Sequence, residues 1–350
     1  MPETTPSQIS KAPSAPRIVA LDLFRGMGAL AAVGIHALQI PLTDYSNRST
    51  PWLVCALINR ALLFAVPAFL LLTTILLTRK LLKDGDLKTY YQKRIPGVLI
   101  PYLIWSLPHA VLFYASVKRF NFGEFALRLL TGKSFFHLYF LGLILQLYLV
   151  LPLLVPFVRR RPSFMLIAPI TLLATLAVYW LNKLVLHLPF QGSVIIWHTV
   201  SVGLGLWLGS REEPLETVLR RALPFAGVAT FVSAAFYLPL AVANLRNERI
   251  DTFHYQLAEW GYTNSASLFL LALATRMRPV PFLLFVGVIS MQMYLLHRIP
   301  IYALDRLVGL RHVLGVPLSV LLATAAGLAL PILAAKLLKN KPLSALLFGR

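Results

Sequence analysis

Long apolar runs, separated by short polar or basic stretches, dominate this chain. They lie near 18–40, 52–78, 95–116, 134–157, 164–182, 192–209, 219–242, 256–275, 282–301 and 313–338. A helix of about 20 apolar residues crosses the ~30 Å hydrocarbon core of a bilayer. Because lipid offers the backbone no hydrogen bonds, runs of this length form helices. The pattern predicts an all-α, polytopic integral membrane protein with about ten transmembrane helices.

Composition supports this class of protein. The 350 residues are 58% hydrophobic and 13% charged, and the mean hydropathy is +0.72, whereas a soluble surface needs more charge. The net charge is +20. Its basic residues lie between apolar runs, not on one soluble face, so a nucleic-acid partner is not expected. The single cysteine, Cys55, excludes an internal disulfide and a cysteine metal site.

The basic residues also predict an orientation. With the N-terminus in the cytoplasm, the inside segments hold 20 Lys and Arg and the outside loops hold 11. This excess favours both termini in the cytoplasm. Residues 1–16 are polar and rich in Pro, Ser and Thr, which predicts a disordered cytoplasmic tail. A transmembrane domain is expected over 17–340 and a short cytoplasmic tail over 341–350.

The first apolar run contains three ionisable residues on one stripe of a helix. Asp22, Arg25 and His36 are separated by 3 and 11 residues, which places them on a single face. Each such group costs at least ~2.5–3.5 kcal/mol at mid-bilayer unless it is paired or functional. One interpretation is a catalytic stripe, in which Asp22 holds Arg25 and His36 acts as a base. The other is a structural ion pair beside a packed histidine.

Two further runs carry candidates for binding. Lys93 and Arg94 enter the third run from the cytoplasm and suit a phosphorylated donor, or alternatively serve as topology signals. The fourth run carries His137 near its outer end and Gln146 deeper. This pattern is also typical of an aromatic belt with an interhelical hydrogen bond.

The ninth run places Ser290, Tyr294 and His297 on one helical face, with His297 at a depth similar to His36. This face suits acceptor binding or, alternatively, interfacial anchoring. The eighth run is the weakest predicted span, because Glu259 and Asn264 interrupt it. Only Asp22 is securely deep among the acidic residues, which is little for an ion-driven transporter. Phosphate-binding loops, metalloprotease motifs and nucleophile elbows are absent from the sequence.

Four motifs in order resemble the acyltransferase 3 family of bacterial membrane O-acyltransferases. They are LDLFRGMGALAAVGIHA with Arg25 and His36, the KR pair before PY at 101–102, HLYFLGLILQLYLVLPLL, and GVISMQMYLLH. The resemblance covers residues 17 to about 340. It is greatest to stand-alone members associated with surface polysaccharides, including the intercellular adhesin type. One departure is Tyr91, which replaces the first arginine of the family's Arg-x-x-Arg motif.

The resemblance implies transfer of an acyl group, expected to be acetyl, from cytoplasmic acyl-CoA to a hydroxyl of a cell-surface or lipid-linked glycan. Acyl-CoA is then a donor substrate, and neither a permanently bound cofactor nor a metal is expected. The implied site residues are as follows: catalytic His36, Arg25 and Asp22; donor-binding Arg94, Lys93 and Arg25; acceptor-binding Tyr294, His297, His137 and Gln146. His36 is either a general base or a covalent acyl carrier.

The implied location is the bacterial inner membrane, with multiple passes through the bilayer. Other expected partners are a second copy of the chain or proteins of polysaccharide synthesis. The final segment is too short for the extracytoplasmic hydrolase-like domain of some relatives. Two rival functions are a flippase or exporter of a polysaccharide or lipid-linked glycan, and an accessory scaffold. Deletion of a flippase would leave acyl content unchanged, and a scaffold would tolerate loss of Arg25 and His36.

Overall fold

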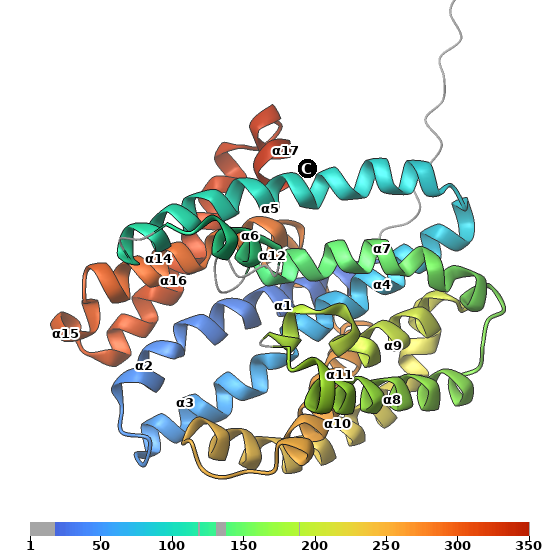
Figure 1. Cartoon of the computed structure of the whole chain (residues 1–350), viewed down its shortest axis with the longest axis horizontal. Helices are drawn as coiled ribbons and strands as arrows, with labels where there is room; N and C mark the ends of the chain where they lie inside the picture. Colours follow the sequence, from blue (N-terminus) through green and yellow to red (C-terminus); the bar gives the residue numbers. More distant parts are fainter. Residues whose placement is uncertain (1–17, 118–119, 131–137, 189, 350) are drawn as a thin grey trace, which may run out of the picture.

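The computed structural model describes residues 18–117, 120–130, 138–188 and 190–349, and these residues form helices and turns without a strand (Figure 1). The helices are α1 (Val19–Ala37), α2 (Gln39–Asp44), α3 (Thr50–Ala61), α4 (Ala65–Asp84), α5 (Leu87–Val117), α6 (Phe122–Leu130), α7 (Tyr139–Arg159), α8 (Phe164–Leu181), α9 (Thr199–Gly209), α10 (Leu215–Leu245), α11 (Thr252–Ala274), α12 (Pro281–Val288), α13 (Ser290–Leu296), α14 (Arg298–Tyr302), α15 (Leu310–Leu314), α16 (Val316–Leu337) and α17 (Pro342–Phe348). The predicted all-α class is confirmed.

Six helical segments are long and apolar enough to cross a membrane within the described part of the chain. The number is seven if α12 and the segment that follows it, which meet at a bend of 69°, form one span. The predicted count of about ten is therefore not confirmed. The segment Ile195–Gly209 is apolar but short. Helix α11 is 23 residues long, but polar residues such as Glu259 lower its hydropathy.

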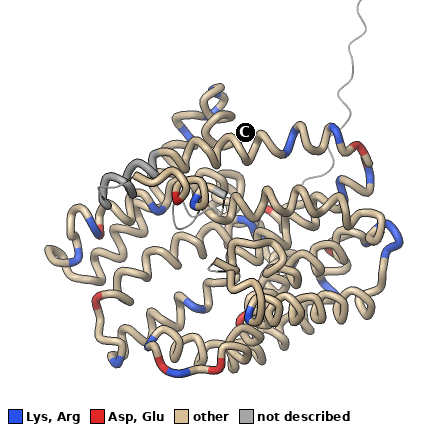
Figure 2. Tube along the Cα trace, viewed as in Figure 1, with Lys and Arg blue, Asp and Glu red and all other residues tan. Residues whose placement is uncertain are grey.

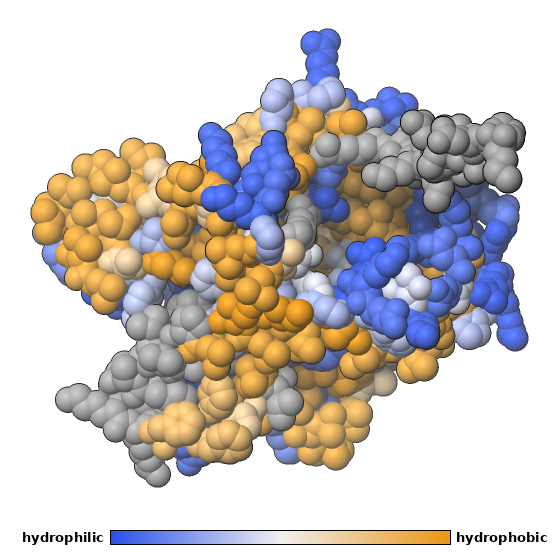
Figure 3. All heavy atoms as spheres, turned by 90° about the horizontal axis from the view of Figure 1, so that it is seen from above, coloured by the Kyte–Doolittle hydropathy of each residue, from blue (hydrophilic) through white to orange (hydrophobic). Residues whose placement is uncertain are grey.

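The outer surface carries large apolar side chains, as expected for contact with lipid. Leu153, Met165 and Phe225 are 77%, 88% and 77% exposed. In Figure 3 hydrophobic residues cover much of the view, and hydrophilic ones gather toward the right. Figure 2 shows Lys and Arg on that same side at the α4–α5 and α7–α8 turns. An apolar surface of this kind would aggregate in water, so it indicates a membrane protein.

Helix α4 lies near the centre of the bundle and packs against α1, α7, α9 and α11, while α10 packs along α11. Helices α1 and α12 cross at very close range. A Cβ added to Gly26 would overlap the carbonyl oxygen of Leu283, and a Cβ added to Gly287 would overlap that of Asp22. Small residues at such a crossing allow two backbones to touch. The charged end of α1 is therefore fixed against α12.

Local capping sets the ends of several helices. The Ser49 hydroxyl accepts a hydrogen bond from the Trp52 amide at 3.3 Å at the start of α3. The Asp251 carboxylate accepts one from the His254 amide at 2.8 Å at the start of α11. Gly85, with φ of 65°, ends α4 in the left-handed conformation. These are common capping solutions, and the last one turns the chain directly into α5.

The end of the chain packs on α5. The indole nitrogen of Trp105 donates to the Leu347 carbonyl at 2.9 Å, and Phe348 stacks on Trp105 with a centroid distance of 6.3 Å. Phe348 is 2% exposed. Residues 342–348 form α17, which packs against α5 (Figure 1).

Candidate active site

A cavity of about 520 Å³ lies where α1, α3, α4, α7, α11, α13 and the turn before α9 meet. Ligand pockets are commonly about 300–1,000 Å³. Its polar lining residues are His36, Gln39, Asn59, Arg60, Tyr139, His198, Gln256, Glu259, Thr263, Asn264, Tyr294 and His297. Three predicted site residues, His36, Tyr294 and His297, thus face one cavity although they come from opposite ends of the sequence.

Two histidines lie close together in the lining of this cavity. The rings of His36 and His297 have centroids 5.1 Å apart. Nδ1 of His297 lies 2.7 Å from the Met293 carbonyl oxygen. Since a carbonyl only accepts, Nδ1 carries the proton and Nε2 holds the lone pair of the neutral ring.

The His36 ring also lies beside an arginine. Nη1 of Arg298 is 3.4 Å from Nδ1 of His36, and a guanidinium can only donate. The pair is possible because α13 bends away from α12 by 69°, which brings the start of α14 to the end of α1. A cation and two imidazoles are thus close together at one end of the cavity.

Opposite charges line the cavity on two other helices. Arg60 comes from the last turn of α3, and Glu259 from the second turn of α11. Nε2 of Gln256 donates to the Glu259 carboxylate at 3.2 Å. Nε of Arg60 is buried without a hydrogen-bond partner among the described residues. A buried donor of this kind can bind an oxygen of a ligand.

The turn between α8 and α9 supplies another wall. Nε2 of His198 donates to the Gly192 carbonyl at 3.0 Å, and both residues line the cavity. Gln146 does not line the cavity. Its amide instead donates to the Ser193 carbonyl at 3.0 Å and accepts from the Ile195 amide at 2.8 Å. The structure therefore places Gln146 as an anchor for the turn that carries His198.

Aromatic side chains complete the lining. Tyr294 meets Phe140 edge to face at 5.4 Å, and Trp197 lies 5.1 Å from Trp260. All four residues line the cavity. Mixed aromatic and polar walls of this type suit a ligand with both ring faces and hydroxyl groups.

The predicted pair of Asp22 and Arg25 is present but lies outside this cavity. Nη1 of Arg25 is 2.8 Å from Oδ1 of Asp22, and the side chains are 23% and 10% exposed. Both residues lie on the part of α1 that packs against α12. Arg25 precedes His36 by eleven residues, which corresponds to about 16 Å along the helix. The stripe on α1 therefore has a closed, charged end and an end that opens into the cavity.

Lys93 and Arg94 lie on α5, and neither lines the cavity. Lys93 is exposed, whereas Arg94 is half-buried. One turn earlier on α5, the Tyr90 hydroxyl donates to the Tyr148 carbonyl at 3.3 Å, which fixes α5 to α7.

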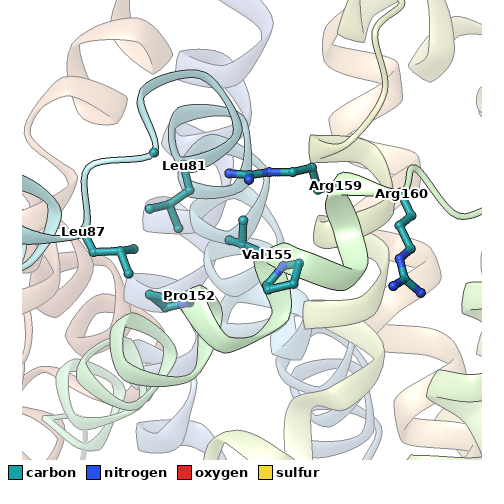
Figure 4. A pocket seen from close by; sticks show the side chains of 8 residues that line it. Leu81, Leu87, Pro152, Val155, Arg159 and Arg160 are labelled. Carbon is teal, nitrogen blue, oxygen red and sulfur yellow. The ribbon is translucent and has the colours of Figure 1, made fainter.

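A separate hollow of about 430 Å³ lies near the start of α5. It is formed by the α4–α5 turn and the last turns of α7. In Figure 4 Arg159 extends across it toward Leu81, and Arg160 points away. Apolar walls are formed by Leu87, Pro152 and Val155. This hollow therefore combines an apolar floor with a basic rim on the side of the molecule rich in Lys and Arg.

One predicted residue, His137, lies outside the described residues. Arg60, Glu259 and His198 were not predicted as site residues. The sequence did contain a signal for Arg60 and Glu259, since both are charged residues within apolar runs and such residues are rare. His198 had no comparable signal, because a histidine at the start of a span is common.

The arrangement can bind a hydroxyl-rich ligand and remove a proton from it. Imidazole suits proton transfer near neutral pH, while Glu259 and Arg60 offer an acceptor and a donor to a ligand's hydroxyl groups. No group of three or more His, Cys, Asp or Glu side chains among the described residues could hold a metal ion.

Comparison with known proteins gives one match. A family model described as an acyltransferase domain matches residues 18–336. Curated proteins and solved structures give no match to this chain. The matched range contains α1 to α15, nearly all of α16 and every residue that lines the cavity. The chain therefore belongs to the acyltransferase 3 family, and its activity is the transfer of acyl groups.

Proposed function

We propose that this protein transfers an acyl group, in the first instance acetyl, from cytoplasmic acyl-CoA to a hydroxyl of a cell-surface or lipid-linked glycan. The cavity around His36 and His297 would be the site of transfer. The protein would lie in a bacterial inner membrane with both termini in the cytoplasm. One observation supports this proposal above all: two histidines 5.1 Å apart face one cavity in a member of an acyltransferase family.

In the proposed reaction His36 accepts the proton of the acceptor hydroxyl. The hydroxyl oxygen forms a bond to the thioester carbonyl carbon, the carbon–sulfur bond breaks, and the coenzyme A thiolate takes the proton from His36. The distance of 3.4 Å between Arg298 and His36 is long for a hydrogen bond. An acceptor hydroxyl can therefore replace Arg298 at Nδ1. Arg298 then stays close enough to stabilise the negative carbonyl oxygen.

The acceptor would bind along Glu259, Arg60 and Tyr294. A sugar needs both donors and acceptors for its hydroxyl groups, and this wall offers a carboxylate, a guanidinium and a phenol. Aromatic residues such as Trp260 can stack on the apolar face of a sugar ring. His297, with its Nδ1 held by Met293, would position the acceptor or the His36 ring.

The donor would bind from the basic side of the molecule. Lys93 and Arg94 supply charge for its phosphates, and the hollow beside Arg159 (Figure 4) can take further phosphate or the flat adenine ring. The acyl-bearing arm would pass the end of α1 that carries Asp22 and Arg25 and cover the roughly 16 Å of helix from there to His36. Arg25 itself is assigned no donor contact, because its guanidinium is paired with Asp22.

The decisive experiment measures glycan esters in cells that carry His36→Ala. Mass spectrometry of surface glycans should show a loss of acyl groups by about 100-fold or more, because a general base commonly supplies 10²–10⁴-fold. His312→Ala is the matched control, since His312 is exposed and lies outside the cavity. Normal acylation with His36→Ala, at wild-type protein levels in the membrane, would remove His36 from the mechanism. Unchanged acylation in a deletion strain would refute the proposed function itself.

The same material separates the two possible roles of His36. Radiolabelled acetyl-CoA added without acceptor should label the protein only if His36 carries the acyl group. Absence of label, together with acyl transfer when acceptor is present, supports the general-base reaction.

A further inference from the structure

A second hollow, larger than the active-site cavity, lies on the outside of the bundle. Its volume is about 1010 Å³, and it separates the pair α8–α9 from the pair α10–α11. Helices pack closely within each pair, but α9 touches α10 and α11 at few positions. The far end of α8 meets the start of α11, where Tyr179 lies 3.0 Å from Thr252 and 5.3 Å from the Phe253 ring. The walls are apolar, with Met165, Leu172, Phe225, Leu257 and Leu268 among the lining residues. We call this hollow the outer groove.

The two ends of the outer groove differ in charge. Arg211, Glu213 and Arg221 lie at one end, where α9 ends and α10 begins. Nη1 of Arg221 is 2.8 Å from the Glu213 carboxylate, and these side chains are 72% and 53% exposed. An exposed ion pair of this kind is weak, so an anionic group can compete for Arg221. The Arg211 guanidinium is fixed by the Pro162 carbonyl at 2.6 Å and lies over Trp207.

The length of the apolar part fits within one leaflet of a bilayer. Arg221 and Ala229 both line the groove from α10, and eight residues of helix cover about 12 Å. This is less than half of the ~30 Å hydrocarbon core. A chain that starts at the arginine end and follows the groove therefore stays within one leaflet.

The groove shares a wall with the active-site cavity. Val200, Trp260 and Asn264 line both. The Ser201 hydroxyl donates to Oδ1 of Asn264 at 2.6 Å, which connects α9 to α11 at this wall. A molecule in the groove therefore contacts the back of residues that face the acyl-transfer site.

We propose that the outer groove binds one anionic phospholipid from the leaflet at its arginine end, with the phosphate at Arg221 and Arg211 and one acyl chain along the groove to Trp260. Charge complementarity selects an anionic headgroup, and the length of the groove selects a single-leaflet chain. The lipid fills the gap between the two helix pairs and supports the wall formed by Trp260 and Asn264. Binding requires none of the substrates of acyl transfer.

Native mass spectrometry of the purified full-length protein tests this proposal. Phosphatidylglycerol or phosphatidylcholine of equal chain length is added to the delipidated protein in detergent. We expect one phosphatidylglycerol to bind about fivefold or more tightly than phosphatidylcholine, because each basic residue near a headgroup favours the anion. Arg221→Gln should remove most of this preference, whereas Arg278→Gln, at an exposed arginine outside the groove, should keep it.

A second pair of variants tests the position of the chain. Ala229 is exposed and lines the groove, whereas its neighbour Val228 is 65% exposed and does not. Ala229→Phe should lower phosphatidylglycerol binding at least fivefold by filling the groove, and Val228→Phe should not.

Two outcomes would overturn the proposal: equal binding of the two lipids, or full phosphatidylglycerol binding by Ala229→Phe. If Ala229→Phe does not fold, Arg221→Gln decides alone, since it changes only a surface side chain. Absence of glycan acylation would refute the proposed acyl acceptor. If lipid binding persists in that case, the proposed lipid site still stands.

Discussion

Both ends of α1 carry ionisable residues, but one end lies in a packed helix crossing and the other borders a cavity. At one end Asp22 and Arg25 form an ion pair of 2.8 Å beside the crossing with α12, where Gly26 leaves no room for a Cβ. At the other end His36 faces a cavity of about 520 Å³ together with His297. The same stripe of α1 therefore has a closed end, where the charges are paired, and an open end, where His36 borders the cavity.

Polar residues inside a membrane can therefore serve two separate physical purposes. In a tightly packed helix crossing, the two members of a charge pair bind each other, so breaking the pair should affect mainly folding. Polar groups around a cavity have capacity left for a ligand, so their removal should affect mainly activity. Stability and catalysis should consequently separate along α1.

The largest effect is expected at the closed end. Arg25→Ala leaves the Asp22 carboxylate buried without its cation, and breaking a buried pair costs about 3–5 kcal/mol. Thermal or denaturant unfolding of the purified protein in detergent should show this loss of stability. His36→Ala should change the stability by less than about 1 kcal/mol in the same assay, because its side chain borders a cavity.

The double variant Asp22→Ala with Arg25→Ala serves as the control and should recover part of the lost stability, because no charge is left unpaired. Arg25→Lys keeps the charge but loses planar contact. If Arg25→Ala is as stable as the wild-type protein yet inactive, the closed end is not structural, and Arg25 instead acts on the donor.

The next effect is expected at the open end. Glu259→Gln keeps the size of the side chain but removes the charge that binds acceptor hydroxyl groups. A hydrogen bond to a charged group contributes about 1.5–3 kcal/mol, so kcat/KM for the glycan should fall about 10- to 100-fold. Acyl transfer by purified protein, measured at several acceptor concentrations, checks this value. The stability loss should be smaller than for Arg25→Ala.

Glu248→Gln is the matched control, because Glu248 is 55% exposed in its side chain and lies 3.9 Å from Arg246 outside the cavity. Unchanged acceptor KM and kcat in Glu259→Gln, with normal folding, would exclude Glu259 from acceptor binding. The functional part of the cavity would then be limited to His36, His297 and Tyr294.

Much of the fold could be predicted from hydrophobic runs alone. Each predicted run contains a helix in the described residues, because an apolar segment in lipid must form its backbone hydrogen bonds within itself. The bend of 69° after α12 could not be predicted, since no proline lies between Val288 and Ser290. Yet this bend is what brings His297 to His36.

Part of the candidate site could also be predicted from the sequence. His36, Tyr294 and His297 were found from helical spacing and family resemblance, and the structure places them in one cavity. Spacing within one helix says nothing about partners on other helices, so the approach of Arg60 to the same cavity as Glu259 was not predicted. Gln146 was expected to bind substrate, but it holds backbone groups of the turn before α9, a contact that only tertiary structure reveals.

The smallest effect is expected far from both ends of α1, at Lys93. Its side chain is exposed on α5, so its attraction for a donor phosphate is screened by salt. Lys93→Gln should raise the KM for acyl-CoA by about two- to fivefold, since exposed charge pairs contribute about 0.2–1 kcal/mol, and the difference should shrink as ionic strength rises. Lys339→Gln, at an exposed lysine near α17, should leave this KM unchanged. A salt-independent effect, or a change in kcat alone, would mean that Lys93 does not bind phosphate, and the donor site would then be sought at Arg94 and the hollow beside Arg159.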